Sequence, residues 1–381
     1  MRKMKLIALK DVCKINMGQS PNSSSYNDYG DGMPFFQGNA NFGERYPITR
    51  VWCNTPTKIA QAEDILISVR APIGALNYAK EECCIGRGLA AITPDRNKVS
   101  QDFIYWALKG KKAELNDKGN GSTFKAISRK ILEETMIPDI NFEQQHKCAE
   151  NLEKIYGIIQ NRRKELLALD DLIKVRFVEM FGDPVSNPKG WDMVELGELT
   201  GIGSSKRIFE KEYVSEGIPF YRTKEIVELS KGNSISTELY ITEERFAEIK
   251  EQYGVPKAGD LLISAVGTIG IIWIVDGKND FYFKDGNLIR VDSSDKFDSV
   301  YMKNLLENLI AEYKKQISSG TAYAALTISG LTKMKVYDVP IELQNQFADF
   351  VHQVDKSKVA VQKALDETQT LFDSLMQEYF G

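Results

Sequence analysis

The sequence predicts an α+β fold in which two similar β-rich domains alternate with two long helices that pair antiparallel. Short motifs recur in the same order in the two halves of the 381-residue chain. Each half combines a β-rich part with a helical part, and both helical parts carry apolar residues at heptad spacing. We therefore expect a pseudo-twofold tandem repeat, with domain 1 at 1–140, a helix at 141–182, domain 2 at 183–340 and a closing helix at 341–381.

The repeat rests on eight matches that keep their order along both halves. The first pairs residues 9–12 with 196–199, and the second pairs 32–36 with 217–221. The others pair 62–68 with 258–264, 72–74 with 268–270, 121–123 with 319–321, 127–128 with 328–329, 137–138 with 339–340, and 181–182 with 380–381. A single short match would mean little, but eight matches in the same order predict a tandem duplication.

Within the β-rich parts, two apolar runs predict buried strands at 64–69 and 260–265. Turns that contain glycine follow both runs, as expected where a strand ends. Residues 103–108 and 301–306 predict the starts of short helices. The two domains should therefore share one order of elements.

The two long helices should contact each other through apolar residues at a 3,4 spacing. These residues are Leu152, Ile159, Leu166 and Ile173 in the first helix, and Val354, Val361, Leu365 and Phe372 in the second. Such sustained heptads predict a coiled coil, although a helix packed on its own domain remains the alternative. A helix of about 35 residues is about 50 Å long, so the pair would act as a rigid spacer.

Several classes of protein are disfavoured by what the sequence lacks. No run of eighteen apolar residues predicts a membrane span, and charges interrupt the apolar part of the N-terminus, so we expect a cytoplasmic protein. The five cysteines have no CxxC spacing, which favours free thiols in a reducing compartment. The chain has two histidines and no phosphate-binding loop or dinucleotide fingerprint. We expect no catalytic centre, no metal and no cofactor.

Taken over the whole chain, the net charge of −4 disfavours a nucleic-acid binder. Taken by segment, however, residues 1–140 carry a net charge of +5 and residues 183–340 a net charge of −5. The charge objection therefore does not hold for domain 1. A sequence reader can also work through base-edge hydrogen bonds while partner subunits supply contacts to phosphates.

The repeated pattern resembles the specificity subunit of type I restriction–modification systems. The resemblance lies in Gly-Ile-Pro-Phe-Tyr-Arg-Thr-Lys-Glu-Ile (217–226), Lys-Ala-Gly-Asp-Leu-Leu-Ile-Ser (257–264), Gly-Thr-Ile-Gly (267–270) and Pro-Ile-Glu-Leu-Gln-Asn-Gln (340–346). It implies that each domain is a target recognition domain that reads half of a bipartite site in double-stranded DNA. It also implies that the helices dock two methyltransferase subunits, that restriction subunits join the complex, and that the subunit itself is not catalytic. The residues expected to mark these partner-binding helices are the heptad residues Leu152, Ile159, Leu166, Ile173, Val354, Val361, Leu365 and Phe372.

Candidate DNA-reading residues are polar or basic and lie in loops or directly after strands. Arg and Lys suit guanine, and Gln and Asn suit adenine, because each presents hydrogen-bonding groups to a base edge. The candidates are Gln19, Ser20, Gln37, Asn39, Arg70, Arg87 and Lys125 in domain 1, and Lys206, Arg222, Lys224, Lys284 and Tyr323 in domain 2.

Two other functions remain open from the sequence. The chain could be an interaction scaffold, with two β-rich domains on a coiled coil and no DNA readout. Less favoured is a nuclease that uses Asp64 or Asp260, since an acidic residue before a buried strand is more often structural.

Overall fold

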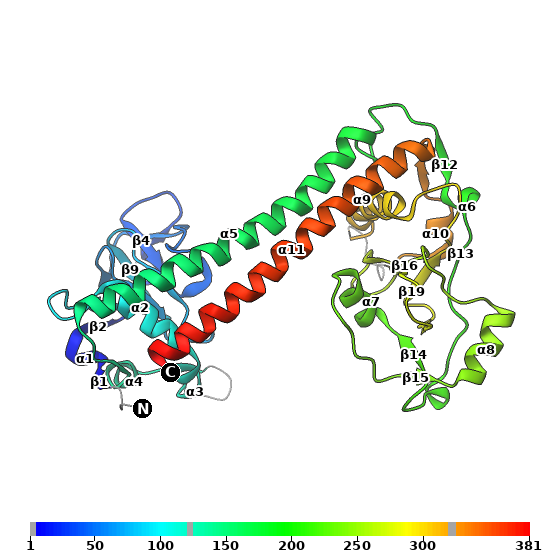
Figure 1. Cartoon of the computed structure of the whole chain (residues 1–381). Helices are drawn as coiled ribbons and strands as arrows, with labels where there is room; N and C mark the ends of the chain where they lie inside the picture. The colour runs from blue at the N-terminus through cyan, green and yellow to red at the C-terminus, as the bar shows by residue number, and fades with distance from the viewer. Residues whose placement is uncertain (1–4, 120–124, 319–324) are drawn as a thin grey trace. The chain divides into compact units, whose positions relative to one another are not determined.

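The computed structural model describes residues 5–119, 125–318 and 325–381. The chain forms two compact units, one of residues 1–164 and 362–381, the other of residues 165–361. Helices α5 (Phe142–Phe181) and α11 (Ile341–Phe380) have 40 residues each, and each contributes to both units (Figure 1). The helices expected from the sequence span 141–182 and 341–381. In the described parts of the chain, no helix is long and apolar enough to span a membrane.

The first unit contains domain 1. Its strands are β1 (Leu6–Ala8), β2 (Cys13–Met17), β3 (Tyr26–Asn27), β4 (Met33–Phe36), β5 (Trp52–Cys53), β6 (Ile59–Ala60), β7 (Ile65–Ser68), β8 (Leu76–Tyr78), β9 (Cys83–Ile85), β10 (Leu89–Pro94) and β11 (Met136–Pro138). Its helices are α1 (Leu9–Val12), α2 (Gln101–Gly110), α3 (Lys112–Asp117) and α4 (Arg129–Glu133), with 3-10 turns η1 (Ser23–Ser25) and η2 (Asn39–Asn41). The sheets have the orders β1-β11, β2-β10-β7-β8 and β3-β5-β4-β9-β6.

The second unit contains domain 2. Its strands are β12 (Met193–Glu195), β13 (Ile202–Gly203), β14 (Ile218–Tyr221), β15 (Tyr240–Ile241), β16 (Leu261–Ser264), β17 (Ile272–Ile274), β18 (Tyr282–Phe283), β19 (Leu288–Val291) and β20 (Lys335–Tyr337). Its helices are α6 (Leu196–Leu199), α7 (Thr223–Ser230), α8 (Glu243–Gln252), α9 (Ser299–Ser318) and α10 (Ile328–Thr332), with a 3-10 turn η3 (Glu210–Glu212). The sheets have the orders β12-β20, β13-β19-β16-β17 and β15-β14-β18.

The two domains repeat one arrangement, as the motif series predicted. In both, a four-stranded antiparallel sheet has the predicted buried strand (β7 or β16) next to β10 or β19. In both, a parallel pair joins β4 to β9 or β14 to β18. The predicted helix starts belong to α2 and α9, but α9 has 20 residues and is not short.

A buried glutamine marks the same position in each half. Gln145 accepts a hydrogen bond from the Ser100 amide (2.7 Å), and Gln344 accepts one from the Asp298 amide (3.0 Å). The side-chain amide of Gln145 also donates to the Ile140 carbonyl, and that of Gln344 donates to the Val339 carbonyl, both at 2.8 Å. Both glutamines are buried, so these bonds tie the long helix to the domain that precedes it.

Two of the eight sequence matches are displaced. Ile127 donates its amide to Val69, and the corresponding donor to Ala265 is Leu326, not Ile328. Likewise, strand β11 ends at Pro138 and strand β20 ends at Tyr337, before the predicted partner Pro340. Dipeptides of common residues are too short to fix a register, which backbone hydrogen bonds set. The match of 121–123 with 319–321 lies outside the described residues.

Helices α5 and α11 pair antiparallel within each unit, as predicted. In the first unit, Arg162 donates to the Ala364 carbonyl and the Thr368 hydroxyl. In the second unit, Lys358 forms an ion pair with Asp170 (2.7 Å). Polar residues that interrupt the heptads therefore pair across the helices. Of the predicted contact residues, Leu152, Ile159, Val354, Leu365 and Phe372 are buried, whereas Leu166, Ile173 and Val361 are half-buried.

The turn before β7 contains a backbone conformation that is costly for its residue. Glu63 has φ +68°, and the corresponding Gly259 in domain 2 has φ +89°. Because side chains other than glycine are disfavoured there, Glu63→Gly should stabilise domain 1 by about 0.5–1 kcal/mol. Chemical denaturation measures the change. Glu81→Gly, at an exposed position without positive φ, is the control and should lose stability. A similar loss in both variants would contradict the prediction.

Candidate nucleic-acid interface

In domain 1, the end of the parallel pair β4–β9 brings two candidate readers together. Gln37 follows β4, and Gly86, Arg87 and Gly88 follow β9. The Gly88 amide donates to the Gln37 carbonyl (3.0 Å). A Cβ atom on Gly86 would lie 2.4 Å from the Gln37 side-chain oxygen, and one on Gly88 would lie 2.5 Å from the Gln37 carbonyl. Glycines on both sides of Arg87 therefore permit this close approach.

The loop after β2 adds Gln19 and Ser20 to the same cluster. The Ser20 hydroxyl donates to the Gln37 side-chain oxygen (2.9 Å) and accepts from the Arg87 amide (3.3 Å). The Gln19 amide donates to the Ile85 carbonyl (3.0 Å) at the end of β9. We call Gln19, Ser20, Gln37 and Arg87 the domain 1 cluster. Gln19, Gln37 and Arg87 are exposed, so their side chains are available to a ligand.

Arg70 and Lys125 extend this edge. The Val69 amide donates to the Gly88 carbonyl (2.9 Å), which connects Arg87 to the end of β7. Arg70 forms an isolated bridge with Ala126, next to Lys125, and both basic side chains are exposed. Asn39, which begins η2 two residues after Gln37, is half-buried. The seven candidates of domain 1 therefore come from adjoining segments.

In domain 2, the corresponding strand ends carry basic residues. The Lys284 amide donates to the Tyr221 carbonyl (2.9 Å), so Lys284 and Arg222 lie at the end of β14–β18. The Lys206 amide donates to the Tyr282 hydroxyl (2.6 Å), which places Lys206 at the same pair. The candidate Tyr323 lies outside the described residues.

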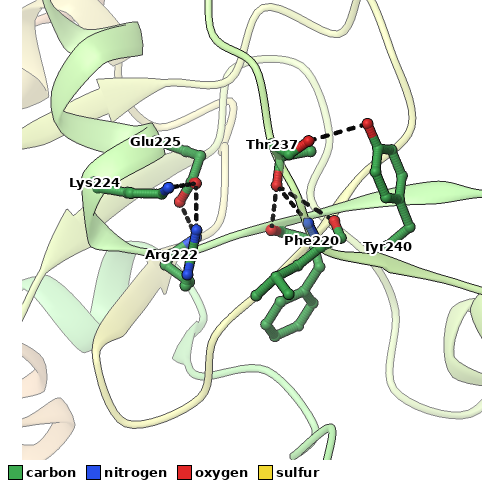
Figure 2. Close-up of polar contacts among 7 residues, drawn as sticks. Phe220, Arg222, Lys224, Glu225, Thr237 and Tyr240 are labelled. Carbon is green, nitrogen blue, oxygen red and sulfur yellow. Dashed lines mark hydrogen bonds and ion pairs between the residues drawn. The ribbon is translucent and has the colours of Figure 1, made fainter. Parts of the chain in front are cut away.

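Arg222 and Lys224 are engaged by a carboxylate that the sequence reasoning missed. Figure 2 shows both side chains directed at Glu225, a residue that is only 2% exposed. Its carboxylate accepts from the Arg222 amide (2.8 Å) and guanidinium (3.1 Å) and lies 3.5 Å from the Lys224 ammonium. The spacing Arg-x-x-Glu before a helix is the available signal, since a carboxylate at this spacing returns to the residue that precedes the helix.

The same view shows how the segment beside β14 is fixed. The Thr237 hydroxyl lies 3.3 Å from the carbonyl oxygen of Phe220 and 3.3 Å from that of Leu239, and its proton is shared between them (Figure 2). The Tyr240 hydroxyl donates to the Thr237 carbonyl (3.1 Å). These bonds fix strand β14, which Arg222 follows directly. The position of Arg222 therefore depends on the Thr237 contacts as well as on Glu225.

Arg222→Ala should destabilise domain 2, because Glu225 would remain buried with only the more distant Lys224 as a cationic partner. Leaving a buried acceptor without its partner costs about 1–3 kcal/mol. Unfolding by urea measures this loss. Lys224→Ala is the matched control, because its side chain is 58% exposed and the change should be small. Equal stability of both variants would show that the Arg222–Glu225 contact does not support the fold.

Charge pairing differs between the two clusters. In domain 2, Arg222 pairs with Glu225 and the neighbouring Arg207 pairs with Asp285 over 2.8 Å. In domain 1, Arg70 and Arg87 form no ion pair within residues 5–119, 125–318 and 325–381. The basic excess of domain 1 is therefore available at its cluster, whereas acidic side chains neutralise two arginines in domain 2.

The two aspartates considered for catalysis act as caps of backbone turns. Asp64 accepts from the Gln61 amide (2.8 Å), and Asp260 accepts from the amides of Lys257 (2.9 Å) and Ser293 (2.8 Å). Both side chains are buried. Within the described ranges, no three His, Cys, Asp or Glu residues form a group that could hold a metal ion. This arrangement does not favour the nuclease alternative.

The chain's sequence matches the model of a known protein family. Residues 1–168 and 188–368 match the model of the type I restriction modification DNA specificity domain. The chain belongs to this family. The two matches coincide with the two halves of the repeat, so each half is one DNA specificity domain, as the resemblance implied.

Relatives within the type I specificity family match parts of the chain. The putative MjaX specificity subunit of Methanocaldococcus jannaschii is 47% identical over 152 residues, which cover 40% of this chain and 36% of the relative. The MjaIX specificity subunit of the same organism is 28% identical over 263 residues, covering 62% and 60%. The matched regions thus span less than two thirds of these relatives' lengths.

Solved structures share the fold of this specificity chain. The S subunit of a type I restriction-modification system from M. genitalium covers 100% of the chain with a TM-score of 0.61 and 16% identity, and 97% of that subunit is matched. A chain from a structure on complex assembly and conformational transition of the type I R-M system gives a TM-score of 0.59 at 17% identity, covering 100% and 98%. At these identities the likeness establishes the fold alone.

Proposed function

We propose that this chain is the non-catalytic DNA specificity subunit of a type I restriction–modification complex in the cytoplasm. Each domain reads one part of a bipartite target in double-stranded DNA. The observation that carries this proposal is the match of both halves to the DNA specificity family. Candidate reading side chains at the end of a parallel strand pair in each domain support it, because amide and guanidinium groups are the donors and acceptors that recognise base edges.

The domain 1 cluster is the better supported of the two reading sites. Gln37 and Arg87 are exposed, and the Ser20 hydroxyl holds the side-chain oxygen of Gln37 in place. A reader whose side chain is already oriented loses less conformational entropy when it binds. In domain 2, Glu225 orients Arg222 and Lys224 in the same way, but it also neutralises them.

The helices would dock two methyltransferase subunits, and restriction subunits would join that assembly. Most of the apolar residues predicted for the helix contact are buried within this chain, so they are not free for a partner. Other apolar side chains of the helices are exposed: Ile158, Leu167, Leu172, Val175, Val178, Val359 and Leu371. We assign methyltransferase docking to these exposed residues, since covering them with a partner would remove apolar surface from water.

Footprinting of the chain in complex with its methyltransferase tests this function. We expect two short protected stretches of DNA with an unprotected gap, because each domain reads its own part of the target. A single contiguous stretch would contradict the bipartite proposal. Loss of DNA binding even with methyltransferase present would favour the scaffold alternative. Cleavage of DNA by the purified chain with Mg²⁺ would instead favour the nuclease.

A further inference from the structure

A hollow in the first unit is lined by two lysines that form no ion pair with any described residue. Its volume is about 390 Å³, and its lining includes Tyr105, Lys109, Lys112, Tyr156 and Gln160. Tyr105 and Lys109 lie one turn apart on α2, and Tyr156 and Gln160 lie one turn apart on α5. The hollow therefore lies between a helix of domain 1 and the first part of α5, apart from the domain 1 cluster.

The ammonium of Lys109 packs against aromatic rings. Its ammonium lies 3.6 Å from the ring centre of Tyr156 and 4.7 Å from that of Trp106. Neither Lys109 nor Lys112 forms an ion pair with any described residue. Rings only partly replace the water that a buried ammonium loses, so an anion at this position would gain a charge-assisted contact.

Glu44 lines this hollow and Glu153 lines an adjoining one, and both carboxylates are already paired with other cations. Glu44 lies 3.1 Å from the Lys164 ammonium, and Glu153 lies 2.6 Å from the Arg45 guanidinium. Neither carboxylate forms an ion pair with Lys109 or Lys112, although the charge of Glu153 still acts on Lys109. An adjoining hollow of about 260 Å³ is lined in part by Trp106. The indole N–H of Trp106 is buried, with no acceptor among the described residues.

We propose that this hollow binds a phosphate group, with Lys109 and Lys112 as its charged ligands and the Tyr105 hydroxyl and Gln160 amide as donors. The phosphate belongs either to a free nucleotide or to the backbone of bound DNA. The hollow is of a size that suits a small ligand. This site goes beyond the proposed reading of base edges and does not depend on it.

The protonation of the lining residues fits an anion site. Burial lowers the pKa of Lys109 to about 8; Lys112 and Arg163 act in the same direction, and Glu153 opposes them. Burial raises the pKa of Tyr105 to about 12, so its hydroxyl remains a donor at neutral pH. A bound anion would raise the pKa of Lys109 again. Affinity should therefore fall as the pH rises from 7 to 9, because the free lysine then loses its proton.

Calorimetric titration of the full chain tests the site, with AMP, inorganic phosphate and a random-sequence DNA duplex as separate probes. We expect saturable binding of AMP at one site. Lys109→Gln should weaken this binding at least tenfold, and Lys112→Gln should weaken it without disturbing the ring contacts. Lys118→Gln, a lysine of the same region that pairs with Glu114 over 2.6 Å, is the matched control and should change affinity less than twofold.

The probes also distinguish the two sources of phosphate. Binding of AMP that weakens in Lys109→Gln assigns the site to a free nucleotide. Weaker duplex binding in Lys109→Gln and Lys112→Gln, with no binding of AMP, assigns it to the DNA backbone. The proposal is overturned if AMP and phosphate do not bind and both variants bind duplex DNA like the unchanged chain. Neither result bears on base reading, which the footprint tests separately.

Discussion

Phe347→Ala should lower the free energy of unfolding of the second unit by about 3–5 kcal/mol, the typical cost of removing a large buried ring. Phe347 is fully buried. Its ring centre lies 5.5 Å from that of Phe177 and 5.6 Å from that of Phe181. Tyr301 of α9 packs against the same two α5 rings. This aromatic cluster joins α5, α11 and domain 2, so its loss should affect all three.

Hydrogen exchange of the full chain is the appropriate measurement for Phe347→Ala, because a chain with two units need not unfold in one step. Protection should fall in residues 165–361 and persist in domain 1. Val359→Ala, which changes a side chain 70% exposed on the same helix, should leave protection unchanged. Equal protection of Phe347→Ala and the unchanged chain would refute the role of the aromatic cluster.

Replacing both Gln37 and Arg87 by alanine should relax DNA discrimination in one part of the target only. A bidentate contact between a side chain and a base contributes about 1–3 kcal/mol of discrimination, so the variant should accept bases that the unchanged domain 1 rejects. Both side chains are exposed, so the fold should persist. The measurement is methylation of a library of target variants by the chain in complex with the proposed methyltransferase partner.

Arg96→Ala is the control for this double variant. Arg96 is an exposed arginine of domain 1 that contacts Gln101 (3.0 Å) outside the domain 1 cluster. Removing it takes one positive charge from the domain without touching the cluster. We expect its methylation pattern to equal that of the unchanged chain. If the double variant also retained that pattern, the domain 1 cluster would not read DNA.

The repeat and the helix contacts could be predicted because both leave a signal in the sequence. The repeat appears as an ordered series of motifs, and the helix contacts appear as apolar residues at a 3,4 spacing. Buried strands, helix bounds and the buried faces at Leu152 and Leu365 follow from apolar spacing, which local sequence reports directly. The displaced match at Ile127 shows the limit of this method. A dipeptide does not specify register, whereas the hydrogen bond from Leu326 to Ala265 does.

Which residues come together in the candidate site was harder to predict from the sequence. Gln37 and Arg87 are 50 positions apart, and only the parallel pairing of β4 with β9 brings them together. Pairing between distant strands leaves no signal in local periodicity. Arg222 shows a second limit of sequence reasoning. Its residue type predicts a DNA reader, but its guanidinium also donates to Glu225 within the fold. Residue type alone does not separate these roles.

Sequencing of methylated bases in cells that express this chain with the proposed methyltransferase partner tests the central claim most directly. If each domain reads its own part of the DNA, the methylated motif will consist of two specific blocks separated by unspecified bases. The Gln37→Ala, Arg87→Ala variant will then relax one block and leave the other unchanged. A motif with a single contiguous block, or a variant that alters both blocks equally, would contradict the account.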